Sequence, residues 1–528
     1  MKKKLRPLER RDILGIACGV LIVLIAVVSL LLANAGSEAG VSDKDIPAEA
    51  QTLYGTAAGR NGDVNVMVVA TQDKIYKIKI VEHEETKNIG TKAVSKLPGE
   101  IYKNNSLHVD GVTGATLTSN AIKEAVYNAL ESGGINPAHF GGSRVKVETV
   151  ALKAETGSPV TVKLSADWAQ EYPEVYASWK ANEENSEATD YLADYPMLTT
   201  LYNGYGFAKD YKAARGHMFD VTDVTGTGRP HPNASCFTCK TPQFTAKVLE
   251  LGDAAYAIPF TEMQESVNEP ISCFNCHANE PGVVTVTHTY LVDGVGKDFE
   301  SIDAENLACG QCHNEYYFNP NNEYKPTTLP HDSLDAMHPD AILAFYNDAS
   351  NFSSGDVFYD WVHADTGVKQ IKVQHPELET YLGEGSQHRD TYTCADCHMA
   401  TVTEGDKTYR SHTLTSPLDN QELLTSECSK CHEDLAAEVK AVQEETERRT
   451  YGIGYQLMFL TNRLAEVKDS PDYTEQELEQ IRSLARDAQF YWDFVFVENS
   501  EGVHNPKLTA YCLDMAESLC SQALGLFK

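Results

Sequence analysis

Hydrophobic residues follow distinct patterns along the chain, and each pattern predicts a different kind of element. Apolar and polar residues alternate in DVNVMVV at 63–69 and in KIYKIKIVE at 74–82, which is typical of half-buried strands. The turn between these runs predicts a small antiparallel sheet. Helical spacing in NAIKEAVYNALESGG at 120–134 and through much of 435–527 predicts amphipathic helices, which are long in the C-terminal stretch.

An uninterrupted apolar run at 13–33 predicts a membrane anchor. It has about the 20 residues that a helix needs to span a bilayer, and six basic residues precede it: Lys2, Lys3, Lys4, Arg6, Arg10 and Arg11. The positive-inside rule then places the rest of the chain on the periplasmic side, at the outer face of the cytoplasmic membrane. A cleaved signal peptide is the alternative, because the ANA sequence at 33–35 has the small-x-small form of a cleavage site. We predict an uncleaved, single-pass anchor.

Composition and charge narrow the range of functions. The 528 residues contain 44 Lys and Arg against 76 Asp and Glu, and 44 − 76 gives a net charge of −32. Such a charge repels phosphates, so we expect no nucleic-acid partner. Hydrophobic residues make up 42% of the chain, enough for packed cores, and the length predicts several domains.

A glycine-rich turn, DGVTGATLTS at 110–119, directly precedes the helical pattern at 120–134. A turn that feeds a helix N-terminus presents free N–H groups and suits a phosphate, although an ordinary turn capped by Thr118 or Ser119 has the same sequence features. The segment 51–135 resembles the flavin-binding domain of membrane redox complexes, in which the last threonine of D-G-x-T-G-A-T carries FMN through a phosphoester. The resemblance implies covalent FMN on Thr116, with Glu85-Thr86 near the start of the domain's loop. A non-covalent flavin or an empty domain are the alternatives.

Cysteine spacing predicts haem. Four segments have the form C-x-x-C-H, the attachment signature of c-type haem, in which two thioethers hold the porphyrin and the histidine reaches the iron. Zinc is the competing interpretation of any single C-x-x-C pair, but the histidine that follows every pair argues against it. The four segments are Cys273, Cys276 and His277; Cys309, Cys312 and His313; Cys394, Cys397 and His398; and Cys428, Cys431 and His432.

A fifth pair, Cys236 and Cys239, is followed by Lys240 instead of histidine. Lysine binds a metal only as the neutral amine, so such a site must lower the lysine pKa by burial and by the charge of the iron. This arrangement predicts a haem that keeps its other face open for a substrate. Ten histidines outside these motifs, from His217 to His504, are available as second axial ligands, and their number alone does not choose among them.

From about residue 166 to the C-terminus the chain resembles the pentahaem, ammonia-forming cytochrome c nitrite reductase family. That family has one C-x-x-C-K haem followed by four C-x-x-C-H haems in this order. The strings ADWAQEYPEVYASWKA, GFAKDYKAARGHMF, CGQCHNEYYF, KVQHPELET and CHMATVT also resemble it. The fusion to a flavin domain is not the usual arrangement of the family, which leaves the electron donor open.

The resemblance implies roles for individual residues. Arg229, Tyr316 and His375 match the active-site side chains of the family. The side chains of Glu315 and Gln374, with the backbone carbonyls of Tyr316 and Lys372, match its calcium ligands. The second axial ligands would be His412 for the second haem, His217 for the third, His504 for the fourth and His388 for the fifth. The long C-terminal helices form a homodimer interface in the family. Cys512 and Cys520 lie too far apart along one helix to form a disulfide and are predicted to be core thiols.

We therefore predict a multidomain fold with an N-terminal transmembrane helix, a small α+β FMN-binding domain, and a mainly α-helical multihaem domain with long C-terminal helices. The predicted segments are a basic tail and anchor at 1–35, a linker at 36–50, the FMN-binding domain at 51–140, a second linker at 141–165 and the pentahaem domain at 166–528.

The predicted function is a membrane-anchored flavin–multihaem reductase that converts nitrite to ammonium with six electrons at the Lys-ligated haem. Hydroxylamine and sulfite are further candidate substrates. The predicted cofactors are five c-type haems, Ca²⁺ and FMN, with a quinol or a membrane dehydrogenase as donor. A flavin transferase and the cytochrome c maturation machinery are the expected assembly partners. The alternative is a flavin–haem conduit from the quinol pool to extracytoplasmic acceptors, which needs no lysine ligand.

Overall fold

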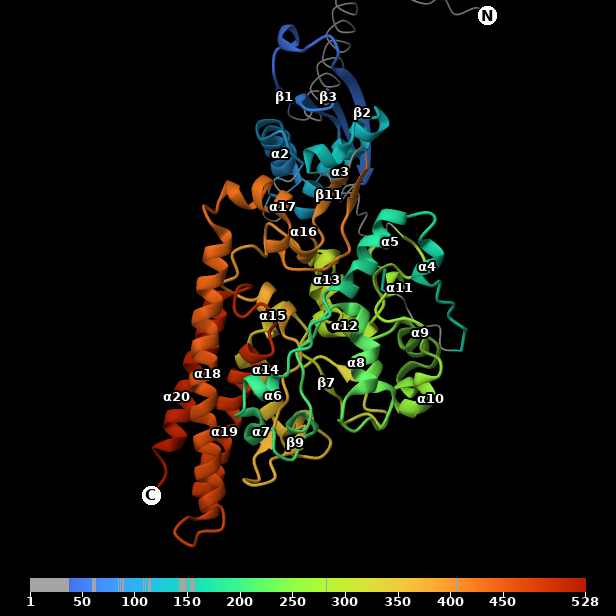
Figure 1. Cartoon of the computed structure of the whole chain (residues 1–528). Helices are drawn as coiled ribbons and strands as arrows, with labels where there is room; N and C mark the ends of the chain where they lie inside the picture. Colours follow the sequence, from blue (N-terminus) through green and yellow to red (C-terminus); the bar gives the residue numbers. More distant parts are fainter. Residues whose placement is uncertain are drawn as a thin grey trace, which may run out of the picture. The chain divides into compact units, whose positions relative to one another are not determined.

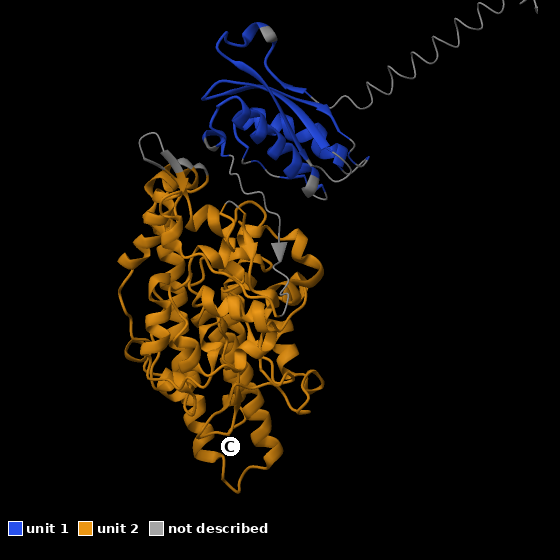
Figure 2. Ribbon diagram, turned by 90° about the vertical axis from the view of Figure 1, so that its right-hand side faces the viewer, with its two compact units in different colours: residues 1–144 blue, residues 145–528 orange. Residues whose placement is uncertain are grey.

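The computed structural model describes residues 38–58, 63–83, 85, 87, 90–107, 109, 111–112, 115–141, 150–151, 157–281, 283–404 and 407–528. The apolar run at 13–33 lies outside these ranges. Within the ranges, no helix has the length and apolar content of a membrane span. The chain divides into two compact units, residues 1–144 and 145–528, which Figure 2 shows in different colours.

The first unit contains the predicted small antiparallel sheet. Its strands are β1 (Glu38–Gly40), β2 (Gln51–Ala58), β3 (Asp63–Ala70) and β4 (Ile75–Glu82), in the order β1-β4-β3-β2. Every neighbouring pair is antiparallel. The alternation in the sequence explains this sheet, because every second side chain of β3 and β4 points into an apolar core.

Two helices complete the core of this unit, α2 (Gly90–Asn104) and α3 (Thr116–Ser132). Helix α3 packs against β2 and β3, and Gly55 makes the close approach possible because a Cβ there would collide with the backbone of α3. Helix α3 begins four residues earlier than its apolar periodicity indicates, with Ala115 as its N-cap. Neither Thr118 nor Ser119 is therefore the cap.

The second unit is mainly helical, with short helices of four to ten residues and two-stranded sheets before its C-terminal part (Figure 1). The short helices are α4 (Ser165–Trp168), α5 (Pro173–Lys180), α6 (Tyr191–Asp194), α7 (Leu198–Leu201), α8 (Asp220–Gly226), α9 (Pro242–Leu251), α10 (Phe260–Gln264), α11 (Cys273–His277), α12 (Thr289–Val295), α13 (Ala304–Gly310), α14 (Pro339–Asn347), α15 (Glu377–Leu382), α16 (Cys394–His398) and α17 (Gln421–Ser426). The strands are β5 (Val150–Ala151), β6 (Thr285–Val286), β7 (Tyr317–Phe318), β8 (Thr327–Thr328), β9 (Trp361–Val362), β10 (Lys369–Gln370), β11 (Thr401–Glu404) and β12 (Lys407–Arg410).

Three long helices form the C-terminal part, as the sequence predicts: α18 (Leu435–Val467), α19 (Glu475–Phe496) and α20 (Pro506–Leu524). They pack against one another (Figure 1). Helix α19 begins at a capping box, in which the Thr474 hydroxyl accepts from the Glu477 N–H and the Glu477 carboxylate accepts from the Thr474 N–H. Cys512 and Cys520 are fully buried in α20, so both are core thiols.

Candidate functional site

The predicted flavin-attachment loop leads directly into the first turn of α3. Thr116 is the first residue of that helix, whereas Asp110, Thr113, Gly114 and Thr86 lie outside the described residues. The Ser119 hydroxyl donates to the Ala115 carbonyl at 2.9 Å and accepts from the Val112 N–H at 2.9 Å, which fastens the loop to the helix.

Glu85 lies close to the start of α3, which follows the predicted attachment loop. The buried Thr118 hydroxyl donates a hydrogen bond to the Glu85 carboxylate, two residues after Thr116. Gly90, at the start of α2, lies against both side chains and leaves no space for a Cβ. Two segments that are far apart in sequence, residues 85–90 and the first turn of α3, therefore meet beside the position where the flavin is predicted.

The five cysteine motifs lie on short helical turns of the second unit. The residues of α11 and α16 are the second and fourth motifs themselves, while the third motif begins at Cys309 in the last turn of α13. In α16 the Thr393 hydroxyl accepts from the Asp396 N–H, and the Asp396 carboxylate accepts from the Thr393 N–H at 2.7 Å. A helical turn brings the two cysteines of C-x-x-C to the same side, as attachment to one porphyrin requires.

Each C-x-x-C-H histidine lies opposite the histidine that the resemblance assigns to it. The separations of the ring centroids are 6.2 Å for His277 and His412, 6.1 Å for His313 and His217, 6.1 Å for His398 and His504, and 6.1 Å for His432 and His388. Two metal–nitrogen bonds of about 2 Å, with roughly 1 Å from each nitrogen to its ring centroid, require about 6 Å. The four pairs therefore fit an iron between each two rings.

The histidines of these pairs also present the correct nitrogen. In five of them Nδ1 is hydrogen-bonded to a carbonyl or carboxylate oxygen, which leaves Nε2 to face the partner ring. The five contacts are His277 to Val283 O (2.8 Å), His398 to Thr415 O (2.9 Å), His412 to Arg410 O (3.0 Å), His432 to Glu438 Oε2 (2.7 Å) and His504 to Glu498 Oε1 (2.7 Å).

Burial keeps several of these rings neutral, which is the state that binds a metal. It lowers the pKa of His217 to about 3 and that of His412 to about 4. His313 differs. Burial lowers its pKa, but the Glu377 carboxylate, 3.8 Å from its Nδ1, outweighs that effect and raises the pKa to about 9. Glu377 lies two residues after His375 and was not singled out from the sequence.

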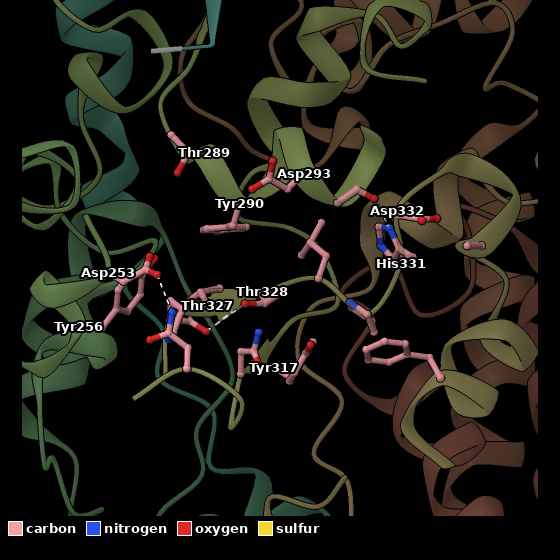
Figure 3. A pocket seen from close by; sticks show the side chains of 18 of the residues that line it. Asp253, Tyr256, Thr289, Tyr290, Asp293, Tyr317, Thr327, Thr328, His331 and Asp332 are labelled. Atoms are coloured by element: carbon pink, nitrogen blue, oxygen red, sulfur yellow. Dashed lines mark hydrogen bonds between the residues drawn. The ribbon is translucent and has the colours of Figure 1, made fainter. Parts of the chain in front are cut away.

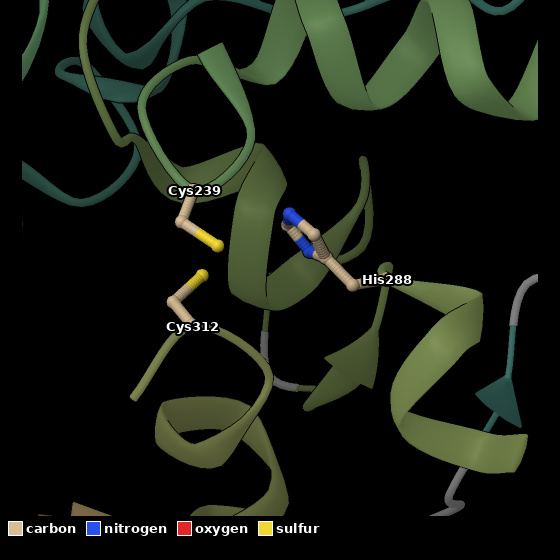
Figure 4. A group of neighbouring side chains, drawn as sticks. All are labelled: Cys239, His288 and Cys312. Atoms are coloured by element: carbon tan, nitrogen blue, oxygen red, sulfur yellow. The ribbon is translucent and has the colours of Figure 1, made fainter. Parts of the chain in front are cut away.

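Contacts between cysteines show the order of the motifs in space. The Cys239 and Cys312 thiols adjoin each other, and so do those of Cys309 and Cys394. The third motif thus lies between the first and the fourth. Cys239, His288 and Cys312 place their ligand atoms within 4.8 Å of one another and resemble a metal site (Figure 4). Both cysteines belong to haem motifs, so we assign this cluster to the closeness of two porphyrin attachments.

The first motif has no histidine, and the three predicted catalytic side chains gather around it. Lys240 Nζ lies 3.8 Å from Asp220 Oδ1. Burial raises the pKa of Cys236, and the nearby positive charge of Arg229 offsets part of this rise. Burial lowers the pKa of His375 to about 4, and the charge of Lys240 acts in the same direction. Burial, then the nearby Cys239, raise the pKa of Tyr316 well above its usual value. The structure therefore brings Arg229, Tyr316 and His375 together at the lysine motif.

The predicted calcium ligands also lie together. Glu315 is fully buried, and its Oε2 accepts from the Gln374 N–H at 2.6 Å, while the Gln374 amide donates to the Lys372 carbonyl at 3.1 Å. Burial raises the pKa of Glu315 well above its usual value, although the Gln374 N–H and the Tyr346 hydroxyl both donate to its carboxylate. Carboxylate and carbonyl oxygens are the ligands that Ca²⁺ prefers, so this set fits that ion once the Gln374 amide turns its oxygen inward.

A cavity of about 610 Å³ in the same unit borders the first motif, because Tyr290, one of its lining residues, contacts the Cys239 thiol (Figure 3). Asp253, Asp293 and Asp332 line it together with His331, whose Nε2 lies 2.8 Å from Glu379 Oε1. None of the predicted catalytic residues lines this cavity. Sequence reasoning gave these residues no role.

Cysteine motifs with paired histidines on a mainly helical unit, in one chain with a flavin-type unit, define a multihaem c-type cytochrome with a flavin-binding domain. The comparisons agree. The cytochrome c552 family matches residues 165–527, and the FMN-binding domain family matches residues 59–131. The chain belongs to the cytochrome c552 family, and an FMN-binding domain precedes the cytochrome part.

Two known proteins illustrate the similarity. Cytochrome c-552 of Desulfotalea psychrophila is 28% identical over 404 residues, which cover 71% of this chain and 75% of that protein. The cytochrome c nitrite reductase of Desulfovibrio desulfuricans, whose catalytic subunit has two calcium sites, superposes with a TM-score of 0.61 at 26% identity. That match covers 69% of this chain and 85% of the other. The predicted resemblance to a nitrite reductase fused to an FMN-binding domain is confirmed, and the protein is a multihaem reductase.

Proposed function

We propose that this reductase converts nitrite to ammonium at a haem attached to Cys236 and Cys239 and bound by Lys240. The observation that carries the proposal is the contrast among the five motifs. Four motif histidines have an opposed imidazole at 6.1–6.2 Å, whereas the first motif has lysine and lies beside Arg229, Tyr316 and His375. A conduit would need only paired haems, so the lysine motif favours the enzyme.

Different side chains of the site bind the substrate and supply protons to it. When bound at Cys236, Cys239 and Lys240, a haem would supply the redox chemistry, in which six electrons and eight protons convert nitrite to ammonium and two waters. Arg229 binds the anion against the general repulsion of a chain with net charge −32. Burial lowers the pKa of His375 to about 4, so the neutral ring donates an N–H to the substrate and passes protons on. Tyr316 is the second proton donor.

Calcium at the Glu315, Tyr316, Lys372 and Gln374 oxygens would hold the loop that carries His375. A divalent ion there would also compensate the buried Glu315 carboxylate. Hydroxylamine and sulfite remain candidate substrates of the same site.

The test is direct. The purified protein should contain five haems by pyridine haemochrome, and with a small artificial reductant it should convert labelled nitrite to labelled ammonium. His375→Ala and Arg229→Ala should each lower turnover at least tenfold, about 1.4 kcal/mol, with the haem content unchanged. A count of four haems would remove the lysine site, and full activity of either variant would remove that residue from the reaction.

We further propose that FMN on Thr116 relays electrons from a quinol or a membrane dehydrogenase to one of the histidine-paired haems. The basic tail and the apolar run at 13–33 support a membrane anchor and a periplasmic location. A flavin can accept an electron pair and release single electrons, which suits one-electron haems. This path requires a flavin transferase and the cytochrome c maturation machinery outside the cytoplasm.

A homodimer is also proposed. Helix α18 exposes an aromatic stripe of Tyr451, Tyr455 and Phe459, with Phe459 56% exposed. Residues four apart lie on one helix face, so the stripe suits the same helix of a second copy. Light scattering should give the dimer mass, and Phe459→Glu should shift it to the monomer. A wild-type monomer would contradict the proposal.

A further inference from the structure

Arg229 is held from one side by a chain of hydrogen bonds. The Arg229 Nε–H donates to the Thr227 hydroxyl at 3.2 Å. The Thr227 hydroxyl in turn donates to Asp210 Oδ2 at 2.7 Å. The Gly228 N–H donates to the same carboxylate oxygen at 2.7 Å. Asp210 therefore fixes both the Thr227 hydroxyl and the backbone just before Arg229.

An aromatic ring fixes the plane of the same guanidinium. The Arg229 Cζ lies 4.2 Å from the centroid of Phe207, within the range of a cation–π contact. Phe207 is itself immobilised, because Tyr211 packs against it edge-on at 4.7 Å and Tyr205 stacks at 5.4 Å. The buried ammonium of Lys372 lies 5.3 Å from this ring as well.

These contacts occupy one edge and one face of the Arg229 guanidinium but do not involve its two terminal nitrogens, Nη1 and Nη2. Among the residues that the structure describes, none accepts a hydrogen bond from Nη1 or Nη2 of Arg229. Two parallel N–H donors match a planar anion with two oxygens, as in the pairing of arginine with carboxylate. A neutral molecule with one oxygen gains little from such a fork.

We propose that Phe207 and Asp210 are positioning residues that preset Arg229 to bind a two-oxygen anion, and that they make the site discriminate nitrite from hydroxylamine. The inference rests on the proposed function and adds a specificity to it. Phe207 and Asp210 touch Arg229 or the segment before it, and neither supplies an electron or a proton.

The experiment compares two substrates in the full-length holoprotein with an artificial reductant. Phe207→Leu keeps an apolar side chain of similar reach but removes the ring. We expect it to raise the nitrite KM about three- to tenfold, as loss of a desolvated cation–π contact predicts, with kcat within about twofold. The Kd from nitrite titration of the oxidised haem spectrum should rise by the same factor, while the hydroxylamine KM stays unchanged. Phe207→Tyr should restore the nitrite KM, and Asp210→Asn should give a smaller increase.

The control is Phe494→Leu, which removes a buried ring of α19 far along the chain from Arg229. Equal changes in Phe207→Leu and Phe494→Leu, or equal losses for nitrite and hydroxylamine, would overturn the inference. If Phe207→Leu does not fold, the nitrite Kd of Asp210→Asn tests the inference instead. An unchanged nitrite Kd in Asp210→Asn would then contradict the inference. Arg229→Ala separates the two levels. If Arg229→Ala leaves nitrite binding unchanged, the proposed function itself is refuted. If Arg229→Ala weakens nitrite binding but Phe207→Leu does not, only the positioning role of Phe207 is refuted.

Discussion

The interiors of the two units differ in how many ionisable side chains they bury. The core of the first unit consists of Val, Ile, Leu and Ala side chains and Phe140, packed between one sheet and two helices. Its buried polar residues among those described are His83, Glu85, Thr118 and Ser119. The second unit buries many ionisable groups, including Glu315, Glu379 and Asp493. Burying a charged group is costly unless something compensates it.

The difference follows from where each cofactor belongs. The predicted flavin site is a loop and a helix N-terminus at the edge of a core that is already complete. The histidine pairs of the second unit have the spacing that an iron between two rings requires, so haem is part of its interior. The first unit should therefore fold from its sequence pattern, and the second should fold only with its cofactors.

The largest expected effect tests this dependence on haem. Cys309→Ala with Cys312→Ala removes attachment at the third motif, which adjoins the first and the fourth. We expect the second unit to be lost to limited proteolysis while a flavin-fluorescent fragment of the first unit survives. Cys512→Ala, which removes a buried thiol not involved in attachment, should retain all haems. A protease-resistant second unit in the double variant would contradict the comparison.

The same contrast explains what the sequence could predict. Strands β3 and β4 have period-two alternation and the C-terminal helices have helical periodicity, so both were predictable from burial alone. Helix α2 was missed because Pro98 lies inside it, and proline usually argues against a helix interior. The short helices of the second unit pack around cofactors, so their sequences carry little periodicity.

The haem ligands show where sequence reasoning ends. Cysteine spacing alone identified the motifs, but the choice of second axial histidines came from resemblance, since ten histidines were available. The carboxylates that hydrogen-bond to the motif histidine His432 and to the second axial histidine His504 could not be recognised from the sequence. Glu438 follows His432 by six residues, whereas Glu498 precedes His504 by six residues. The carboxylate thus lies on different sides of the histidine in the sequence, and no common motif results. Only the fold brings these groups together.

The second prediction concerns the flavin. Thr116→Ala removes the proposed attachment oxygen, so in-gel flavin fluorescence should disappear. Turnover with membranes and their natural donor should collapse, whereas turnover with a small reductant that reaches the haems directly should survive. Thr118→Ser, which retains a hydroxyl beside Glu85, is the matched control and should keep its flavin. Equal activity of Thr116→Ala in both assays would mean that the flavin is bypassed.

The third prediction tests the independence of the first unit's core. Ile122 is fully buried in α3, and Ile122→Ala should destabilise this unit by about 2–5 kcal/mol through lost burial and a residual cavity. Differential scanning calorimetry should show a lower first transition, with the haem absorption spectrum and haem-unit transition unchanged. Asn120→Ala, at an exposed position of the same helix, should change the transition little. A parallel loss of haem-unit stability would show that the two cores are coupled.

The smallest expected effect concerns one buried charge of the second unit. Glu498 is 5% exposed, and its Oε1 lies 2.7 Å from Nδ1 of His504. A carboxylate there makes the imidazole a stronger donor and favours the oxidised iron, so Glu498→Gln should raise the midpoint potential of one haem by tens of millivolts. For a one-electron couple, 59 mV corresponds to a tenfold change in equilibrium. Spectroelectrochemical titration measures the shift, with Ser500→Ala as the control for the hydrogen bond to Oε2. Glu85→Gln, the same change in the first unit, should leave every haem potential where it was. Identical titrations of Glu498→Gln and the wild type would mean that His504 does not ligate a haem or that its carboxylate partner does not tune it.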